Sequence, residues 1–191
     1  MVSVGINAYG DHAFQLVSGE DRFEMMRDRI HFRTMAIVHE TLYGLFRDPY
    51  EPLKAAGLKP GQRVLEVGCG PGFFTIPAAE IVGKSGSVTS VDVSPTAVAH
   101  VRQKVEEAGA PNVEVVLANA ADTGMTSETF DLVFVFGLGH VVGNLADMWE
   151  ELHRLLEPGG MLSVEGRYQP PGHLFRSLDR RGRITRFEKR G

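Results

Sequence analysis

The sequence predicts an α/β fold with a doubly wound, mostly parallel sheet. Stretches with helical spacing of apolar residues alternate with short apolar runs, and runs such as DLVFVF at 131–136 are apolar at nearly every position. Such continuous apolar character is typical of parallel strands that crossover helices cover on both faces. A glycine-rich stretch at 68–72, directly after the first run, is a third observation, because such turns bind ligands in these folds.

A helical arm is expected at the start of the chain. From about 20 to 46, apolar residues recur at helical spacing, and Asp48-Pro49 ends the pattern. A second, short helix is expected over 51–56. We therefore divide the 191 residues into an amino-terminal helical arm or lid over 1–57 and one sheet domain over 58–191.

Strands then alternate with helices that form the crossovers of a parallel sheet. We expect strands over 63–67, 87–91, 113–117, 130–136 and 161–165, and helices over 73–82, 95–108 and 145–156. Ser94 ahead of Pro95 is the expected cap of one helix. After the fifth strand, the stretch 167–173 leaves no room for a full helix. The remaining residues predict two antiparallel strands that turn at 179–182, the second over 184–189.

Composition narrows the class of protein. The net charge of −4 argues against a surface built mainly to bind nucleic acid. Cys69 is the single cysteine, so an intramolecular disulfide and a four-thiolate zinc site are excluded, and the seven histidines form no i, i+4 pair, so we expect no metal. The first residues lack the features of a secretion signal, and no apolar run approaches the roughly 20 residues that span a bilayer. A cytoplasmic protein is expected.

The glycine-rich stretch predicts a nucleotide-like ligand. Gly68 can turn the chain sharply, Gly70 can let backbone amides approach a ligand, and Gly72 can open a helix towards it. The spacing does not fit the dinucleotide pattern GxGxxG, and no lysine completes a P-loop. Asp92 ends the second strand, where an acid can accept both hydroxyls of a ribose. A tight turn with no ligand would need only one glycine, so an adenosine-containing ligand is the better interpretation.

These residues resemble a known family. The resemblance runs from about Leu58 to Gly166 and lies in five segments: EVGCGPG at 66–72, Asp92, ANAAD at 118–122, FDLVFVF at 130–136 and LLEPGGMLSVE at 155–165. In order and spacing these are similar to class I S-adenosylmethionine-dependent methyltransferases, and most to the small-molecule group that includes the ubiquinone and menaquinone enzymes. The resemblance implies a Rossmann-like, seven-stranded sheet closed by an antiparallel hairpin, S-adenosyl-L-methionine as cofactor and a small-molecule methyl acceptor.

The resemblance also implies a set of cofactor-binding residues: Glu66, Gly68, Cys69, Gly70, Gly72, Asp92, Val93, Asn119 and Ala120. Glu66 and the loop backbone would hold the methionine part, Asp92 the ribose, and Val93 the adenine. Asn119 stands where the family usually carries an aspartate, and its carbonyl can still accept a hydrogen bond from the adenine amino group. Cys69 is expected to be a small, buried side chain and not a nucleophile.

His140, in the loop after the fourth strand, is the candidate catalytic residue, as a base or as a group that orients the acceptor. The alternative, a histidine that only fixes its own loop, stays open. No catalytic dyad is required, because alignment of two reactants can by itself lower a barrier by about 7 to 11 kcal/mol.

The acceptor and partners are less constrained. Candidates to line a lid are Tyr9, His31, His39 and Tyr43. The basic carboxyl-terminal hairpin leaves an RNA methyltransferase open as an alternative, and the lack of a compelled catalytic residue leaves a non-catalytic, cofactor-binding regulatory or assembly protein. Because a helix after the fifth strand is missing, either the amino-terminal arm or a second subunit has room to cover one face of the sheet near that edge. We favour the second subunit, and hence a homodimer.

Overall fold

The computed structural model describes residues 48–137 and 144–191 of the chain. The helices are α2 (Tyr50–Ala56), α3 (Thr75–Val82), α4 (Pro95–Ala108) and α5 (Leu145–Leu155). The strands are β1 (Arg63–Val67), β2 (Ser87–Asp92), β3 (Val113–Leu117), β4 (Phe130–Val135), β5 (Leu156–Glu165), β6 (Phe175–Arg181) and β7 (Ile184–Lys189). The predicted arm lies outside the described residues as far as residue 47.

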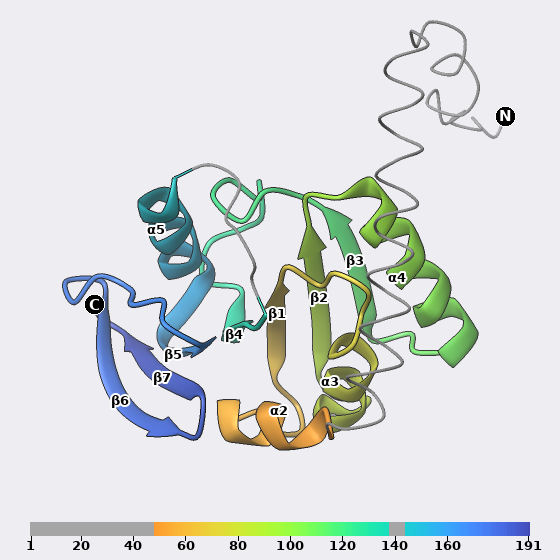
Figure 1. Ribbon diagram of the computed structural model, residues 1–191, viewed down its shortest axis with the longest axis horizontal. Helices are drawn as coiled ribbons and strands as arrows, with labels where there is room; N and C mark the ends of the chain where they lie inside the picture. The colour runs from red at the N-terminus through yellow and green to blue at the C-terminus, as the bar shows by residue number, and fades with distance from the viewer. Residues whose placement is uncertain (1–47, 138–143) are drawn as a thin grey trace, which may run out of the picture.

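The seven described strands form one mixed sheet in the order β3-β2-β1-β4-β5-β7-β6 (Figure 1). The first five strands pair in parallel, and β7 pairs antiparallel with both β5 and β6. The doubly wound α/β sheet and its closing hairpin are thus confirmed. Among the described helices, none combines the length and the apolar character needed to span a membrane.

Helices α4 and α5 begin at side-chain caps. The Ser94 hydroxyl accepts a hydrogen bond from the Ala97 amide at 3.3 Å, with Pro95 in the first turn, which confirms the predicted cap. Asn144 caps α5 in the same way, through a 2.9 Å bond from the Ala146 amide. These caps satisfy amide groups that a helix start leaves without partners, so both helix starts are fixed by local sequence.

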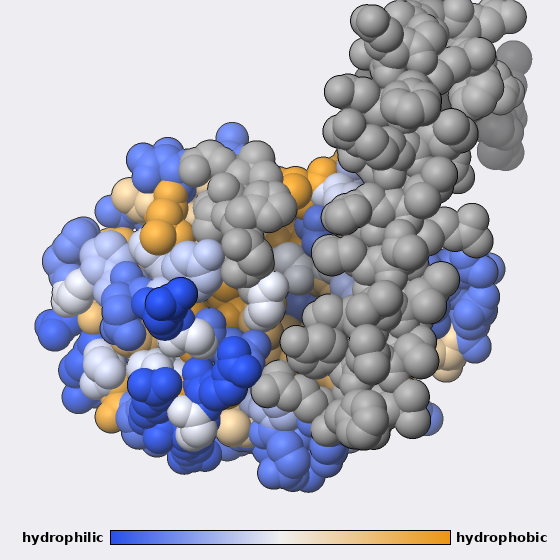
Figure 2. Space-filling model, viewed as in Figure 1, coloured by the Kyte–Doolittle hydropathy of each residue, from blue (hydrophilic) through white to orange (hydrophobic). Residues whose placement is uncertain are grey.

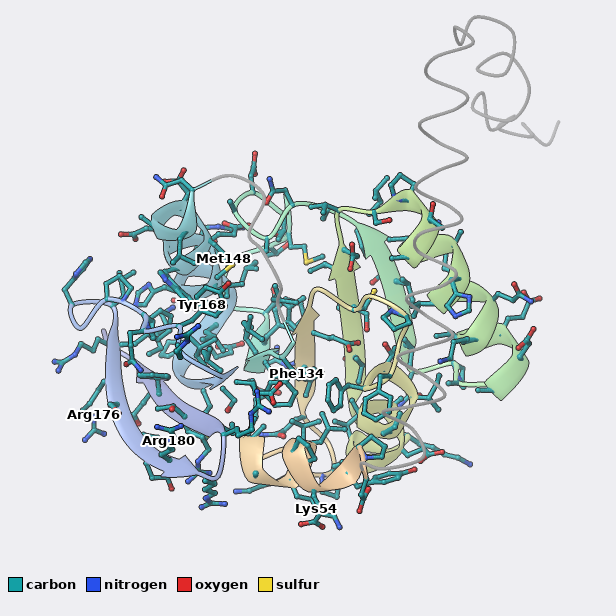
Figure 3. All side chains as sticks on the ribbon, in the orientation of Figure 1. Lys54, Phe134, Met148, Tyr168, Arg176 and Arg180 are labelled. Carbon is teal, nitrogen blue, oxygen red and sulfur yellow. The ribbon has the colours of Figure 1, made fainter. Side chains whose placement is uncertain are left out.

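The core has a layer on each face of the sheet. Helices α2 and α3 cover one face, where Leu53 and Phe134 are buried among strand residues, and α4 extends this layer over β2 and β3. Helix α5 covers the other face with its apolar side, and Trp149 is only 2% exposed there, as its helical spacing predicts. Figure 3 shows the labelled Phe134 inside the molecule and Met148 on α5.

The connection between β3 and β4 contains no helix. None of the predicted helices falls between these strands, and residues 118–129 cross without one. Side chains of α5 instead bind the polar groups of this loop: Arg154 donates to Met125 O and Ser127 Oγ, and Glu151 accepts from Thr123. Hydrogen bonds from Arg154 and Thr123 lower the pKa of the Glu151 carboxyl to about 2. This support comes from residues about 30 positions away, so no local pattern predicts it.

Three boundaries differ from expectation. Helix α3 begins at Thr75 and not at residue 73, because 70–74 form turns. Strand β5 begins at Leu156, directly after α5, and a register shift against β4 accommodates its proline and glycines. The hairpin turns at Gly182 and the residue after it, later than the predicted 179–182, with Asp179 inside β6 and ion-paired to β7. Residues 166–174 form no helix, as expected.

Candidate functional site

The strand order predicts a ligand-binding crevice at one edge of the sheet. From β1 the chain crosses to β2 and β3 on one side, and then to β4 and β5 on the other. In open α/β sheets, ligands bind at the carboxyl ends of the strands where successive crossovers diverge, which here lies between β1 and β4. The registers place Val91, Val67, Val135 and Val164 in one row across four strands. The residues that follow this row in sequence therefore stand at the crevice edge.

The glycine loop after β1 bends back over the end of β2. Gly68, Gly70 and Gly72 have φ values of 75°, 50° and 77°, in the left-handed region that favours glycine. The amides of Gly68 and Cys69 both donate to Val91 O, at 2.9 and 3.1 Å. The sharp turn predicted from the glycines is therefore present.

Gly70 and Gly72 differ in their surroundings. Among residues 48–137 and 144–191, a Cβ added at Gly70 would meet nothing within 4 Å, so this part of the chain leaves the loop backbone uncovered there. A Cβ at Gly72 would lie 3.0 Å from Val101 Cγ2 of α4. Gly72 therefore permits close packing of the loop on α4 and does not itself open α3, which begins at Thr75. Space beside Gly70 is what a ligand cradled by backbone needs.

Asp92 joins the loop to the end of β2. Its Oδ2 accepts a 2.9 Å hydrogen bond from the Gly70 amide, and its Oδ1 accepts one of the same length from the Ser94 amide. Each carboxylate oxygen has a further lone pair that can accept a hydroxyl proton. The acid that the sequence assigns to a ribose thus lies in contact with the loop that it assigns to the methionine part.

Glu66 lies in the sheet below the loop and is only 2% exposed. It stands opposite Ser90 in the β1–β2 register, and the hydroxyls of Ser90 and Thr75 both donate to its Oε2. Burial raises the pKa of the Glu66 carboxyl to about 7, although these two hydrogen bonds act in the opposite direction. The geometry shows Glu66 connecting β1, β2 and the start of α3, while its predicted contact with the cofactor stays a prediction.

The predicted adenine side lies beside Asp92. The Ala118 amide donates to Asp92 O at 3.1 Å, which brings the segment after β3 against the end of β2. Val93 is 43% exposed, as a residue that flanks a ring would be. Asn119 Oδ1 accepts from the Ala121 amide at 3.0 Å, so the local turn already uses one of its lone pairs. Ala120 is half-buried and packs against the core below α5.

Cys69 is buried at 4% exposure, and burial raises the pKa of its thiol above the usual range. A neutral, enclosed thiol is a poor nucleophile, in agreement with the sequence interpretation. His140 and the four lid candidates lie outside the described residues, so their roles stay predictions. Within 48–137 and 144–191, no three His, Cys, Asp or Glu side chains gather as a metal site would require.

Sequence reasoning missed one acid at this edge. Glu165 ends β5, and its Oε2 accepts a 3.2 Å hydrogen bond from the Gly137 amide just beyond β4. Its Oε1 lies 3.3 Å from Arg183 Nε in the hairpin turn. An available signal was its place at the end of an apolar strand, the same position that singled out Asp92.

Comparison with known proteins agrees with this geometry. A family profile described as a methyltransferase domain matches residues 64–160, more than half of the chain. The chain therefore belongs to the methyltransferase domain family, within the class I S-adenosylmethionine-dependent methyltransferases.

Its relatives include two demethylmenaquinone methyltransferases. The protein from Lysinibacillus sphaericus is 36% identical over 113 residues, which is 59% of this chain and 47% of the relative. The protein from Listeria welshimeri is also 36% identical, over 63% of this chain and 51% of the relative. The chain thus spans about half the length of these curated relatives. A crystal structure of a methyltransferase from Aquifex aeolicus matches with a TM-score of 0.68 at 24% identity, covering 84% of this chain and 97% of that one, which shows the shared fold.

Proposed function

We propose that the chain is an S-adenosylmethionine-dependent methyltransferase that acts on a small-molecule acceptor. The observation that carries this proposal is the contact between the Asp92 carboxylate and the Gly70 amide, beside the open space over Gly70. The cofactor supplies a methyl group on a positively charged sulfur, which a nucleophile can take by in-line displacement. The residues of the chain then have to bind, align and exclude water.

Different residues along the crevice would bind different parts of the cofactor. The backbone of Gly68 and Gly70 would hold the methionine part, Asp92 would accept hydrogen bonds from the ribose hydroxyls, and Val93 would pack against the adenine. Glu66 would act from below, because its bonds to Ser90 and Thr75 fix the strand ends that carry the loop. This assignment places the cofactor over β1, β2 and β3.

A small acceptor is supported by the names of the relatives, which act on demethylmenaquinone. Demethylmenaquinone, reduced to its hydroquinone so that the ring can act as the nucleophile, is therefore the first acceptor to test. The atom that receives the methyl group, a homodimer and the role of His140 remain predictions from the sequence.

The charge pattern of the hairpin favours a small molecule over RNA. Four basic side chains of its strands and turn pair with carboxylates of the chain: Arg176 with Glu188, Arg181 and Arg186 with Asp179, and Arg183 with Glu165. Lys189 lies 3.6 Å from Glu128. Figure 3 shows the labelled Arg176 and Arg180 on the outer edge of the sheet, and Figure 2 shows hydrophilic residues over this part of the surface. Basic side chains that are already paired with carboxylates neutralise few phosphates of an RNA. They therefore displace few of its bound counterions and contribute little to RNA affinity.

Titration calorimetry with S-adenosylhomocysteine tests the cofactor site, and we expect saturable binding with one site per chain. A chain that binds neither S-adenosylmethionine nor S-adenosylhomocysteine would refute the proposal. Transfer of labelled methyl groups to the hydroquinone form of demethylmenaquinone, or to another defined small molecule, separates an enzyme from a non-catalytic binding protein. Transfer to RNA alone would favour the RNA alternative.

A further inference from the structure

The proposed cofactor occupies only one half of the crevice. Its predicted contacts come from the ends of β1, β2 and β3, so a second reactant has to lie over the ends of β4 and β5. In the row that follows Val91, Val67, Val135 and Val164 stand Asp92, Gly68, Phe136 and Glu165. Three strand spacings of about 4.8 Å separate the Asp92 and Glu165 positions by roughly 14 Å. The two acids therefore mark opposite ends of the crevice.

In the described chain, β4 ends at an apolar residue, Val135, and β5 ends at the ionisable residue Glu165. Its side chain is 16% exposed, so part of it remains accessible from the surface. The Gly137 amide at 3.2 Å fixes one carboxylate oxygen at the end of β4. The Gly166 amide, which donates to Arg183 O at 3.2 Å, fixes the backbone beside it. The position of the carboxylate is thus set by two strands and a turn.

The second contact of Glu165 is easily exchanged. The side chain of Arg183 is 65% exposed, and its Nε lies 3.3 Å from Glu165 Oε1. Ion pairs with so much access to water contribute about 1 kcal/mol or less. A ligand that brings its own donor into the crevice can therefore share or replace this contact, while the bond from Gly137 keeps the carboxylate in place.

We infer that Glu165 is the residue that selects the methyl acceptor, by accepting a hydrogen bond from a hydroxyl or an ammonium group of that molecule. The inference rests on the proposed function, because it takes the β1–β3 half for the cofactor. It names the acceptor class as small molecules with a hydrogen-bond donor near the methylated atom. A carboxylate at this place disfavours acceptors whose nearest group is itself an anion.

The test compares Glu165→Gln with Glu157→Gln. Glu157 belongs to the same strand, and its Oε1 lies 3.0 Å from Arg63 Nη2, but at the amino end of the sheet. Both variants lose one ion-paired carboxylate of β5, so general effects on folding are matched. Binding is measured by calorimetry in saturating S-adenosylhomocysteine. The probes are dihydroxynaphthalene, dimethoxynaphthalene, which lacks hydroxyl donors, and benzylamine as the ammonium arm.

We expect Glu165→Gln to weaken binding of dihydroxynaphthalene or benzylamine about tenfold or more, because the neutral amide carbonyl is a weaker acceptor than the charged carboxylate. The probe that responds identifies the donor as hydroxyl or ammonium. Dimethoxynaphthalene should bind both proteins equally, and Glu157→Gln should stay within about twofold of wild type for every probe.

Three results overturn the inference. One is a loss of dimethoxynaphthalene affinity in Glu165→Gln that equals the loss for the donor probes, which would indicate a structural role. Another is an unchanged affinity of Glu165→Gln for both donor probes. The third is a cofactor-loaded wild type that binds neither donor probe. If S-adenosylhomocysteine itself does not bind wild type, the proposed function fails instead, so the two failures are distinguishable.

Discussion

The two ends of the crevice are built from different contacts. At the β1–β3 end, backbone amides donate hydrogen bonds to acceptors at the end of β2. The Gly70 and Ser94 amides donate to the Asp92 carboxylate, and the Gly68 amide donates to the Val91 carbonyl. At the β5–β7 end, Glu165 accepts one backbone amide bond from Gly137 and also forms an ion pair with a distant side chain, Arg183 in the hairpin turn. The first kind of site needs a short glycine-rich motif and one acid, whereas the second depends on pairing along the whole chain. Cofactor sites are accordingly easier to recognise from sequence than acceptor sites.

The largest effect is expected from Asp92→Ala. The variant loses the acceptor for the ribose hydroxyls and leaves the Gly70 and Ser94 amides without their partner. Two hydrogen bonds to a charged group contribute about 1.5 to 3 kcal/mol each, so affinity for S-adenosylhomocysteine should fall at least about 100-fold. Calorimetry measures this, with Asp122→Ala in the exposed loop as the control. If Asp92→Ala kept an S-adenosylhomocysteine affinity within about threefold of wild type, the β1–β3 end would not be the cofactor site.

Glu66 should make stability depend on pH. Its folded pKa of about 7 lies above the usual carboxyl value of 4.5, so the folded chain holds this proton more tightly than the unfolded chain does. Protonated Glu66 therefore adds to the free energy of unfolding. This stabilisation is complete below about pH 4.5 and is lost as pH rises through 7, by about 3 kcal/mol in total.

Glu66→Gln cannot ionise and removes this dependence. Urea unfolding of both proteins between pH 5 and pH 8 gives the difference in free energy of unfolding, in which other titrating groups cancel. That difference should shift in favour of the glutamine variant as pH rises. A difference that stays constant with pH would show that Glu66 is ionised in the folded protein.

Gly70→Ala should mainly weaken cofactor binding, whereas Gly72→Ala should mainly lower the free energy of unfolding. The Gly72 variant places a methyl group 3.0 Å from Val101 at a φ of 77°, so its free energy of unfolding should fall by about 1 to 3 kcal/mol. The Gly70 variant bears only the cost of its φ of 50°, about 1 to 2 kcal/mol, but should weaken S-adenosylhomocysteine binding because its methyl group enters the open space. Urea unfolding and calorimetry on both variants provide the comparison. Equal loss of affinity in the two would contradict the different roles of the glycines.

The smallest effect is expected from the double change Arg176→Gln and Arg180→Gln on the outer strand. Affinity for S-adenosylhomocysteine should change less than about twofold, because these side chains lie outside the crevice. Fluorescence anisotropy with a single-stranded RNA should show weak binding in wild type, with little further loss in the variant. Tight, strongly salt-dependent RNA binding that the variant abolishes would restore the RNA hypothesis.

The sequence predicted those features that depend on neighbouring residues. The Ser94 cap, the apolar face that carries Trp149 and the bend at Gly68 are confirmed, because each follows from a few adjacent side chains or from backbone freedom. The contacts of Glu66 with Ser90 and Thr75 needed the strand register, which no local pattern contains.

Long-range support explains the remaining differences. The contacts of Arg154 and Glu151 of α5 with the loop 118–129 could not be predicted, because they join residues about 30 positions apart. Asp179 continues β6 because Arg186 pairs with it from β7. Glu165 was overlooked because its partners at 137 and 183 come together only in the folded sheet.

The bond between Asp92 and the Gly70 amide has a consequence for the energetics of recognition. Since the chain itself holds the loop against β2, the conformational entropy of ordering that turn belongs to folding and not to complex formation. Association with the methyl donor should then proceed without a slow rearrangement of this segment, and selectivity among nucleosides would reside in how fast each one leaves.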